Sequence, residues 1–155
     1  MKLSIVAVGN KMPAWVSAAF AEYAKRMPSE APLALTEIRP EPRGAKPVSR
    51  LLEAERARIE AALSPGVRVV ALDERGGQLD SVRFAELLEE WMQSGRDVAF
   101  LIGGPDGLHP SLKDRAERQL SLSRFTLPHG LARVVLAEQL YRALSIVRHH
   151  PYHRA

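Results

Sequence analysis

The sequence predicts an α/β fold in which a mostly parallel sheet is flanked by helices. Segments typical of strands alternate with segments typical of helices along the chain, as in parallel βαβ units. Two apolar runs, VRVVALD at 67–73 and DVAFLI at 97–102, are continuous, which is typical of strands covered on both faces. The length of 155 residues suits one domain, and no linker, repeat or low-complexity tract divides residues 1–155.

Local patterns place each element in turn. Five segments are predicted as strands, because they are apolar throughout or alternate apolar with polar residues: 2–8, 33–39, 67–73, 97–102 and 120–127. Five others have the apolar spacing of helices: 13–27, 48–63, 81–95, 109–119 and 131–150. Pro13 is expected in the first turn of its helix. Asp80 or Ser81 is expected to cap the third helix, and Gly95 to end it.

The composition narrows the class of protein. The sequence has no cysteine, which excludes a disulfide framework, a thiolate metal site and a cysteine nucleophile. A net charge of +4 is compatible with a nucleic-acid partner but does not require one. No segment approaches the roughly 20 apolar residues that span a membrane, and the apolar run at the N-terminus is too short for a signal peptide. We therefore expect a cytoplasmic protein with no membrane partner.

Ligands of such sheets bind beyond the carboxyl ends of the strands, here the loops after Asp73, Ile102 and Leu127. The loop after Ile102 reads GGPDG. It lacks the lysine and hydroxyl residue of a phosphate loop, its glycine spacing is not that of a dinucleotide fingerprint, and Asp106 would repel a phosphate. Two interpretations remain: a tight turn fixed by Pro105, or a loop whose backbone is approached by a ligand other than a bare polyphosphate.

Two segments that contain histidine are candidates for chemistry. His129, in SRFTLPHG, is either a capping or surface residue or a titratable group at the carboxyl edge of the sheet. The tail RHHPYHRA at 148–155 holds histidines, Tyr152 and Arg154 without an acidic residue, so we expect no metal there. The tail is either a frayed basic end or a surface that stacks on bases and pairs with phosphates.

The last predicted helix is apolar around most of its circumference. Its apolar residues are Leu131, Val134, Val135, Leu136, Leu140, Tyr141, Leu144, Ile146 and Val147. One apolar stripe is enough to cover a sheet, so the remaining apolar surface predicts a second buried contact. A homodimer is the economical explanation, and deeper burial within one chain is the alternative.

Four segments together resemble one family along the whole chain. They are AVGNKMPAWV at 7–16, FLIGGPDGL at 100–108, LSLSRFTLPHGLARVVLAEQLYRA at 120–143 and HHPYHR at 149–154. The chain is similar to the RlmH family of SPOUT methyltransferases, which methylate N3 of a pseudouridine in bacterial 23S ribosomal RNA. It departs from the family mainly on helix surfaces and in the loop 40–47, which carries Arg43 and Lys46.

The resemblance implies S-adenosylmethionine as cofactor, a trefoil knot in the C-terminal half, a homodimer, and a 23S rRNA substrate within the assembled ribosome. The positions it implies for the cofactor are Leu72, Asp73, Gly103, Gly104, Leu122, Ser123, Arg124, Phe125, Thr126, Leu127 and Pro128. The implied catalytic positions are His129, Tyr152 and Arg154. The candidate RNA contacts are Lys11, Arg142, His153 and Arg154.

N3 of a pseudouridine carries a proton that must leave during methylation. We expect Arg154 to stabilise the developing anion, His129 to position the base or accept the proton, and Tyr152 to stack or hydrogen-bond. The alternative is a non-catalytic ribosome-binding or assembly factor that keeps the fold but not the activity. A small-molecule nucleotide enzyme is a third interpretation, but the glycine loop lacks a phosphate-anchoring lysine.

Overall fold

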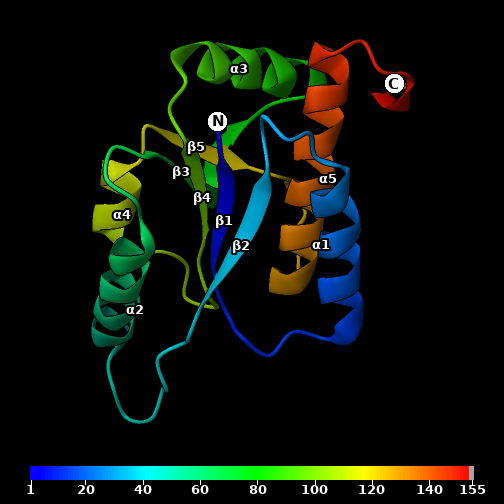
Figure 1. The fold of residues 1–155 in the computed structure, drawn as a ribbon. Coiled ribbons are helices and arrows are strands. Elements are labelled where there is room, and N and C mark those ends of the chain that lie inside the picture. Colours follow the sequence, from blue (N-terminus) through cyan, green and yellow to red (C-terminus); the bar gives the residue numbers. More distant parts are fainter. Residues whose placement is uncertain (154–155) are drawn as a thin grey trace.

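The computed structural model describes residues 1–153 and shows a five-stranded sheet with helices on both faces (Figure 1). Every strand pairing is parallel, in the order β2-β1-β4-β3-β5. The strands are β1 Leu3–Val8, β2 Leu33–Ile38, β3 Arg68–Gln78, β4 Val98–Ile102 and β5 Arg118–Ser121. The predicted α/β class with a parallel sheet is therefore confirmed.

The helices form two unequal layers. They are α1 Ala14–Arg26, α2 Val48–Ala62, α3 Ser81–Ser94, α4 Pro110–Arg115 and α5 His129–Val147, and a short 3-10 turn, η1, covers Pro151–His153. Helices α1, α3 and α5 pack on one face of the sheet, and α2 and α4 cover the other (Figure 1). Within residues 1–153 no helix is both long and apolar enough to cross a membrane.

Burial on both faces explains the continuous apolar run of β4. Val98, Phe100 and Ile102 join the core under α1, α3 and α5. Ala99 and Leu101, which point the opposite way, join the core under α2 and α4. Because successive side chains of a strand alternate between faces, a central strand with two covered faces has no position for a polar residue.

Two strands differ from their predicted bounds by more than one residue. The strand predicted at 67–73 continues to Gln78 as β3, after an irregularity between Leu72 and Gly77 in its pairing with β5. Gly76 makes this close pairing possible, since an added Cβ would lie 2.7 Å from the carbonyl carbon of Leu120. The strand predicted at 120–127 is wrong beyond Ser121, and residues 122–128 form a loop.

The ends of α3 are as predicted, whereas the helix predicted at 109–119 ends at Arg115 and the one predicted at 131–150 ends at Val147. The Asp80 side chain caps α3 by accepting from the Arg83 amide at 2.8 Å, and Gly95 ends the helix in the left-handed conformation with φ of 73°. Pro13 is the N-cap of α1 and lies just outside the first turn in which it was expected. Pro128 has the same position at α5, which therefore begins two residues before the predicted Leu131.

Helix α5 finds much of its second buried surface within its own chain. Both α1 and α3 pack against it, and each of its residues is buried or half-buried. Leu136, Leu140 and Leu144 face the core, whereas Val134 and Val135 keep part of their surface exposed. Deeper burial within one chain thus accounts for part of the apolar circumference. The homodimer and the trefoil knot stay predictions.

Candidate active site

A cavity of about 760 Å³ lies at the carboxyl edge of the sheet, a size within the range of small-molecule sites. It is enclosed by the middle of β3, the glycine loop, the loop 122–128 and the start of α5. The predicted loop after Ile102 is confirmed, whereas the predicted loop after Asp73 is part of β3 and the third loop begins before Leu127. The lining of the cavity includes Leu72, Asp73, Gly103, Gly104, Leu122, Ser123, Phe125, Thr126, Leu127 and His129. Of the positions implied for the cofactor, Arg124 and Pro128 do not line it.

The glycine loop is a tight turn folded back on itself. The Gly107 amide donates to the Gly104 carbonyl at 2.9 Å, and Gly107 has φ of 79°. A Cβ on Gly103 would lie 2.4 Å from the Gly107 carbonyl carbon, and one on Gly104 would lie 3.2 Å from Val8 Cγ1. Gly103 is thus required by the turn itself, and the turn brings its backbone to the cavity wall.

The loop 122–128 is held by local hydrogen bonds that replace the sheet ladder. Ser121 Oγ donates to the Ser123 carbonyl at 3.0 Å, and Ser123 Oγ accepts from the Phe125 amide at 2.9 Å. Arg124 Nε donates to Gln78 Oε1 at 3.2 Å, so this side chain lies against the end of β3 and points away from the cavity lining. Phe125 is 85% exposed and lies at the rim.

Asp73 supplies a fixed negative charge to the cavity. Its carboxylate accepts from the Arg75 amide at 2.8 Å and pairs with Lys113 at 3.0 Å. Burial raises the pKa of Asp73, but the Arg75 amide and Lys113 together outweigh that effect and hold the pKa below its usual value. The carboxylate is therefore ionised at neutral pH.

His129 lies at the start of α5 and contributes to the cavity wall. Its Nε2 is 3.1 Å from Arg133 Nη2. Burial lowers the pKa of His129, the positive charge of Arg133 lowers it further, and the backbone at Gly103 and Val8 acts in the opposite direction. The net shift is downward, so His129 is neutral at neutral pH.

Arg133, which sequence reasoning missed, is the largest fully buried side chain of the described residues. Its guanidinium donates to Glu37 Oε2 at 2.8 Å and to the Gly9 carbonyl at 2.7 Å. It is the single charged residue in the apolar run LARVVLA at 131–137, four positions after His129. A single charged residue within an apolar run could have indicated that the Arg133 side chain is buried.

Sequence comparison identifies the family to which this chain belongs. A family model described as "Predicted SPOUT methyltransferase" matches residues 1–153, which include every loop of the site. The chain belongs to the SPOUT methyltransferase family. Two relatives are named "Ribosomal RNA large subunit methyltransferase H", one from Nitrosomonas eutropha and one from Burkholderia thailandensis. Each is 59% identical, over 155 and 156 residues respectively, and each match covers 100% of both chains.

Two solved structures share this fold at low sequence identity. A probable methyltransferase from Bordetella pertussis matches with a TM-score of 0.59 and 19% identity, over 92% of this chain and 95% of that one. A probable methylase family protein from Haemophilus influenzae matches with a TM-score of 0.57 and 13% identity, over 99% of this chain and 70% of the other. These similarities bear on the fold alone.

In this SPOUT methyltransferase the implied catalytic residues do not meet within one chain. Tyr152 follows α5 in the chain, but η1 folds back beside the helix: the Tyr152 hydroxyl donates to Glu138 at 3.1 Å, and its ring packs edge-on against Tyr141. His129 begins α5 and lies nine residues before Glu138, a rise of about 14 Å that also turns to the opposite face of the helix (Figure 1). Arg154 lies outside the described residues.

The Tyr152 hydroxyl keeps its proton. Burial raises its pKa well above the usual value, and hydrogen bonding with Tyr23 and the negative charge of Glu138 act in the same direction. Sequence reasoning missed Glu138, which also pairs with Arg142 at 2.6 Å. Tyr152 is therefore a hydrogen-bond donor and a stacking surface, and it is not a base at neutral pH.

The candidate RNA contacts are spread over two ends of the molecule. Lys11 is exposed and follows β1 at the carboxyl edge of the sheet. Arg142 is engaged with Glu138, and its guanidinium lies 5.1 Å from the centre of the Tyr152 ring. The backbone of His153 belongs to η1.

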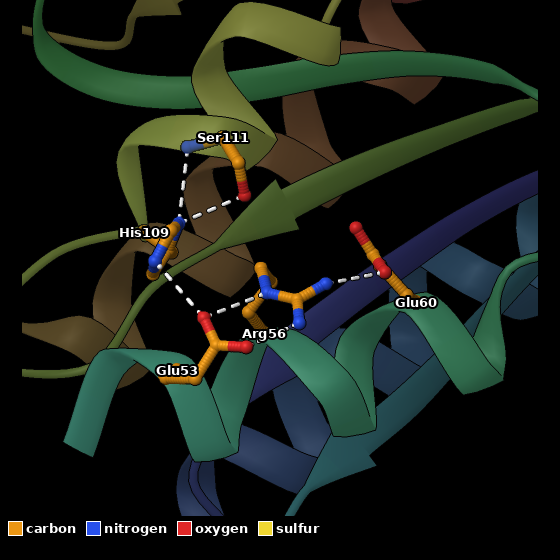
Figure 2. A network of polar contacts seen from close by, with 5 residues as sticks. All are labelled: Glu53, Arg56, Glu60, His109 and Ser111. Carbon is orange, nitrogen blue, oxygen red and sulfur yellow. Dashed lines mark hydrogen bonds and ion pairs between the residues drawn. The ribbon is translucent and has the colours of Figure 1, made fainter. Parts of the chain in front are cut away.

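A polar network fixes the far end of the glycine loop (Figure 2). His109 caps α4: its Nδ1 accepts from the Ser111 amide at 3.0 Å, and its Nε2 lies 3.1 Å from Glu53 of α2. Glu53 also accepts from Arg56 Nε at 3.0 Å, and Arg56 pairs with Glu60 at 2.6 Å. Among residues 1–153 no group of three histidine, aspartate or glutamate side chains is placed to hold a metal.

Proposed function

We propose that this protein transfers a methyl group from S-adenosylmethionine to 23S ribosomal RNA, at N3 of a pseudouridine in the assembled ribosome. One observation carries the proposal: the cavity is built from the segments shared with full-length relatives named ribosomal RNA large subunit methyltransferase H. The proposed location is the cytoplasm, where ribosomes work.

The cavity's chemistry suits a methyl donor of this kind. Leu72, Leu122 and Leu127 supply apolar walls, and the turn at Gly103 presents backbone amides and carbonyls. Among the charged residues that line the cavity, the acidic Asp73, Glu74 and Asp106 outnumber the basic Arg75 and Lys113, a balance that disfavours a polyphosphate. When bound, S-adenosylmethionine supplies a methyl group already activated on a positively charged sulphur.

The chain's own task is alignment and the exclusion of water. Fixing two reactants in a productive arrangement can supply roughly 7–11 kcal/mol of the barrier to reaction. The glycine loop and the loop 122–128 are both fixed by internal hydrogen bonds, so the wall is pre-formed. His129 stands where this wall meets the start of α5.

We further propose a homodimer in which each cavity is completed by the tail of the other chain. Within one chain Tyr152 packs against Glu138 and Tyr141. His129 lies nine residues before Glu138, about 14 Å along α5 and on the opposite face of the helix, so the two side chains do not face the same base. A two-fold arrangement that lays the α5 helices antiparallel places each tail at the other chain's cavity. Tyr152 of the partner subunit then stacks or hydrogen-bonds at the base, with Arg154 of the partner subunit stabilising the anion.

The test is methyl transfer from radiolabelled S-adenosylmethionine to three substrates: ribosomes lacking the modification, protein-free 23S rRNA, and ribosomes that already carry it. The proposal expects label in the first substrate and little in the other two. Label in free rRNA alone would refute the ribosomal substrate. Ribosome binding without any transfer would favour the non-catalytic assembly factor.

A further inference from the structure

A buried charge next to the cavity determines the state of His129. The Arg133 side chain is 1% exposed, and its guanidinium makes three polar contacts. Nη1 donates to Glu37 Oε2 at 2.8 Å, Nη2 donates to the Gly9 carbonyl at 2.7 Å, and the same Nη2 lies 3.1 Å from His129 Nε2. Three elements thus converge on one guanidinium: β2 through Glu37, the end of β1 through Gly9, and α5.

The chemistry of the guanidinium decides which group donates in the contact between Arg133 Nη2 and His129 Nε2. Arginine has five N–H donors and no acceptor, and it stays charged in proteins. His129 Nε2 must therefore offer its lone pair to Arg133, and the single proton of the neutral ring is on Nδ1. A doubly protonated ring would direct an Nε2–H against a positively charged donor, which is unfavourable both as a hydrogen bond and as a charge pair.

Close packing at Gly9 leaves the side chains of His129 and Arg133 little freedom to take another arrangement. Gly9 has φ of 132°, and a Cβ there would lie 2.9 Å from His129 Nε2 and 3.0 Å from Arg133 Nη2. A glycine at this position therefore lets the end of β1 close over both side chains. Hydrogen bonding with the backbone at Gly103 and Val8 raises the pKa of His129, but burial and Arg133 outweigh it.

The other charged groups at the cavity do not offset Arg133 at this short distance. They line the same cavity from β3, from the loop after β4 and from α4: Asp73, Glu74, Arg75, Asp106 and Lys113. Asp73 is paired with Lys113, and Asp106 is paired with Arg43. Glu37 reaches His129 only through Arg133, whose charge it partly compensates.

We propose that Arg133 is a positioning residue that holds His129 as the neutral Nδ1–H form, with the Nε2 lone pair occupied, so that His129 orients the substrate side of the cavity and does not take the N3 proton. The consequence for methylation rests on the proposed function, whereas the state of His129 does not. Proton acceptance passes to a group outside this pair or to solvent.

The experiment is nitrogen-15 NMR of labelled protein from pH 5 to pH 8, with H129Q used to assign the His129 signals. In the wild-type protein Nε2 is expected to show the chemical shift of an unprotonated nitrogen and Nδ1 that of a protonated one. In R133M the pKa of His129 should rise toward its ordinary value of about 6.5, and protonated Nε2 should appear. In E37Q, which leaves Arg133 uncompensated, the pKa should fall further.

The controls keep the test decisive. R83M removes an exposed arginine of α3 that also pairs with a glutamate, and it should leave the His129 signals unchanged. A wild-type Nε2 that is protonated at neutral pH would overturn the proposal, and so would R133M signals identical to the wild type. If R133M does not fold, the direction of the E37Q shift decides.

These spectra need neither cofactor nor RNA, so they are independent of the proposed function. Spectra as expected, together with no methyl transfer, would refute the function alone. Where transfer is observed, the acid limb of the single-turnover rate should move to higher pH in R133M and not in R83M. An unmoved acid limb would refute the positioning role while leaving the methyltransferase activity standing.

Discussion

Replacing Gly103 by alanine tests whether the glycine turn sets the geometry of the cofactor cavity. The new Cβ would lie 2.4 Å from the Gly107 carbonyl carbon and 2.9 Å from the Leu108 amide nitrogen. Both neighbours are backbone atoms, so no side chain can rotate away. The backbone at residue 103 and the backbone at residues 107–108 must move apart by about 1 Å to regain an ordinary contact distance.

The magnitude follows from that displacement. Overpacking of this kind costs about 1–3 kcal/mol in the free energy of unfolding, or about 2–4 °C in melting temperature for each kcal/mol in a protein of this size. A misplacement of about 1 Å costs about 10²-fold in a reaction that depends on alignment. We therefore expect G103A to bind S-adenosylmethionine at least about tenfold more weakly, and its single-turnover rate to fall by about 10²-fold.

The assay is isothermal titration calorimetry with S-adenosylmethionine, combined with thermal unfolding. G95A is the matched control: unlike Gly103, Gly95 has no atom within 4 Å of an added Cβ, and it has φ of 73° at the distant C-terminal end of α3. Its left-handed backbone costs about 1–2 kcal/mol of stability, yet its affinity for the cofactor should equal that of the wild type. A G103A variant that binds the cofactor as tightly as the wild type would refute the role of the turn.

Four further outcomes are expected. H129Q, whose amide oxygen can accept from Arg133, should keep a single-turnover rate within about tenfold of the wild type, whereas general-base catalysis by His129 predicts a loss of about 10² or more. Folding lowers the pKa of His129, so the unfolded chain takes up a proton there at a higher pH than the folded chain does. The free energy of unfolding should therefore fall as the pH drops below about 6.5, and it should fall less in H129Q. An equal pH dependence in both proteins would contradict this. Ribosome binding should weaken steeply with salt, and K11A should lower the slope of the log–log plot by about one if Lys11 contacts a phosphate. Mixing the tail variant Y152A with the cavity variant G103D should restore about a quarter of wild-type activity if each site uses two chains, and none if it does not.

Much of the fold could be predicted because its causes are local. The apolar run at 97–102 reports burial on both faces of β4, and Asp80 and Gly95 end α3 through contacts within a few residues. The error at residues 122–127 also has a local cause. Alternating residues indicate a strand, but Ser123 satisfies the backbone near Phe125 with its own hydroxyl, and β5 ends at Ser121.

The candidate site could be predicted only in part. The place of the cavity follows from the rule that ligands bind at the carboxyl ends of parallel strands, since Asp73, the loop after Ile102 and Leu127 all line it. The strand bounds around Asp73 and Leu127 were not predicted correctly. Arg133 escaped prediction because its partners Glu37 and Gly9 lie 96 and 124 positions away in sequence. The separation of His129 from Tyr152, which packs against Glu138 and Tyr141 on another face of α5, escaped it as well, since a linear motif does not state which residues share a space.

The central claim is that this chain methylates N3 of a pseudouridine in 23S rRNA. The most direct measurement is mass spectrometry of nucleosides and RNA fragments from ribosomes that lacked the mark and were incubated with the protein and S-adenosylmethionine. The account predicts one added methyl group, on a pseudouridine of 23S rRNA and at N3, with G103A giving little product. Unmodified 23S rRNA, or a methyl group on a different base, would contradict it.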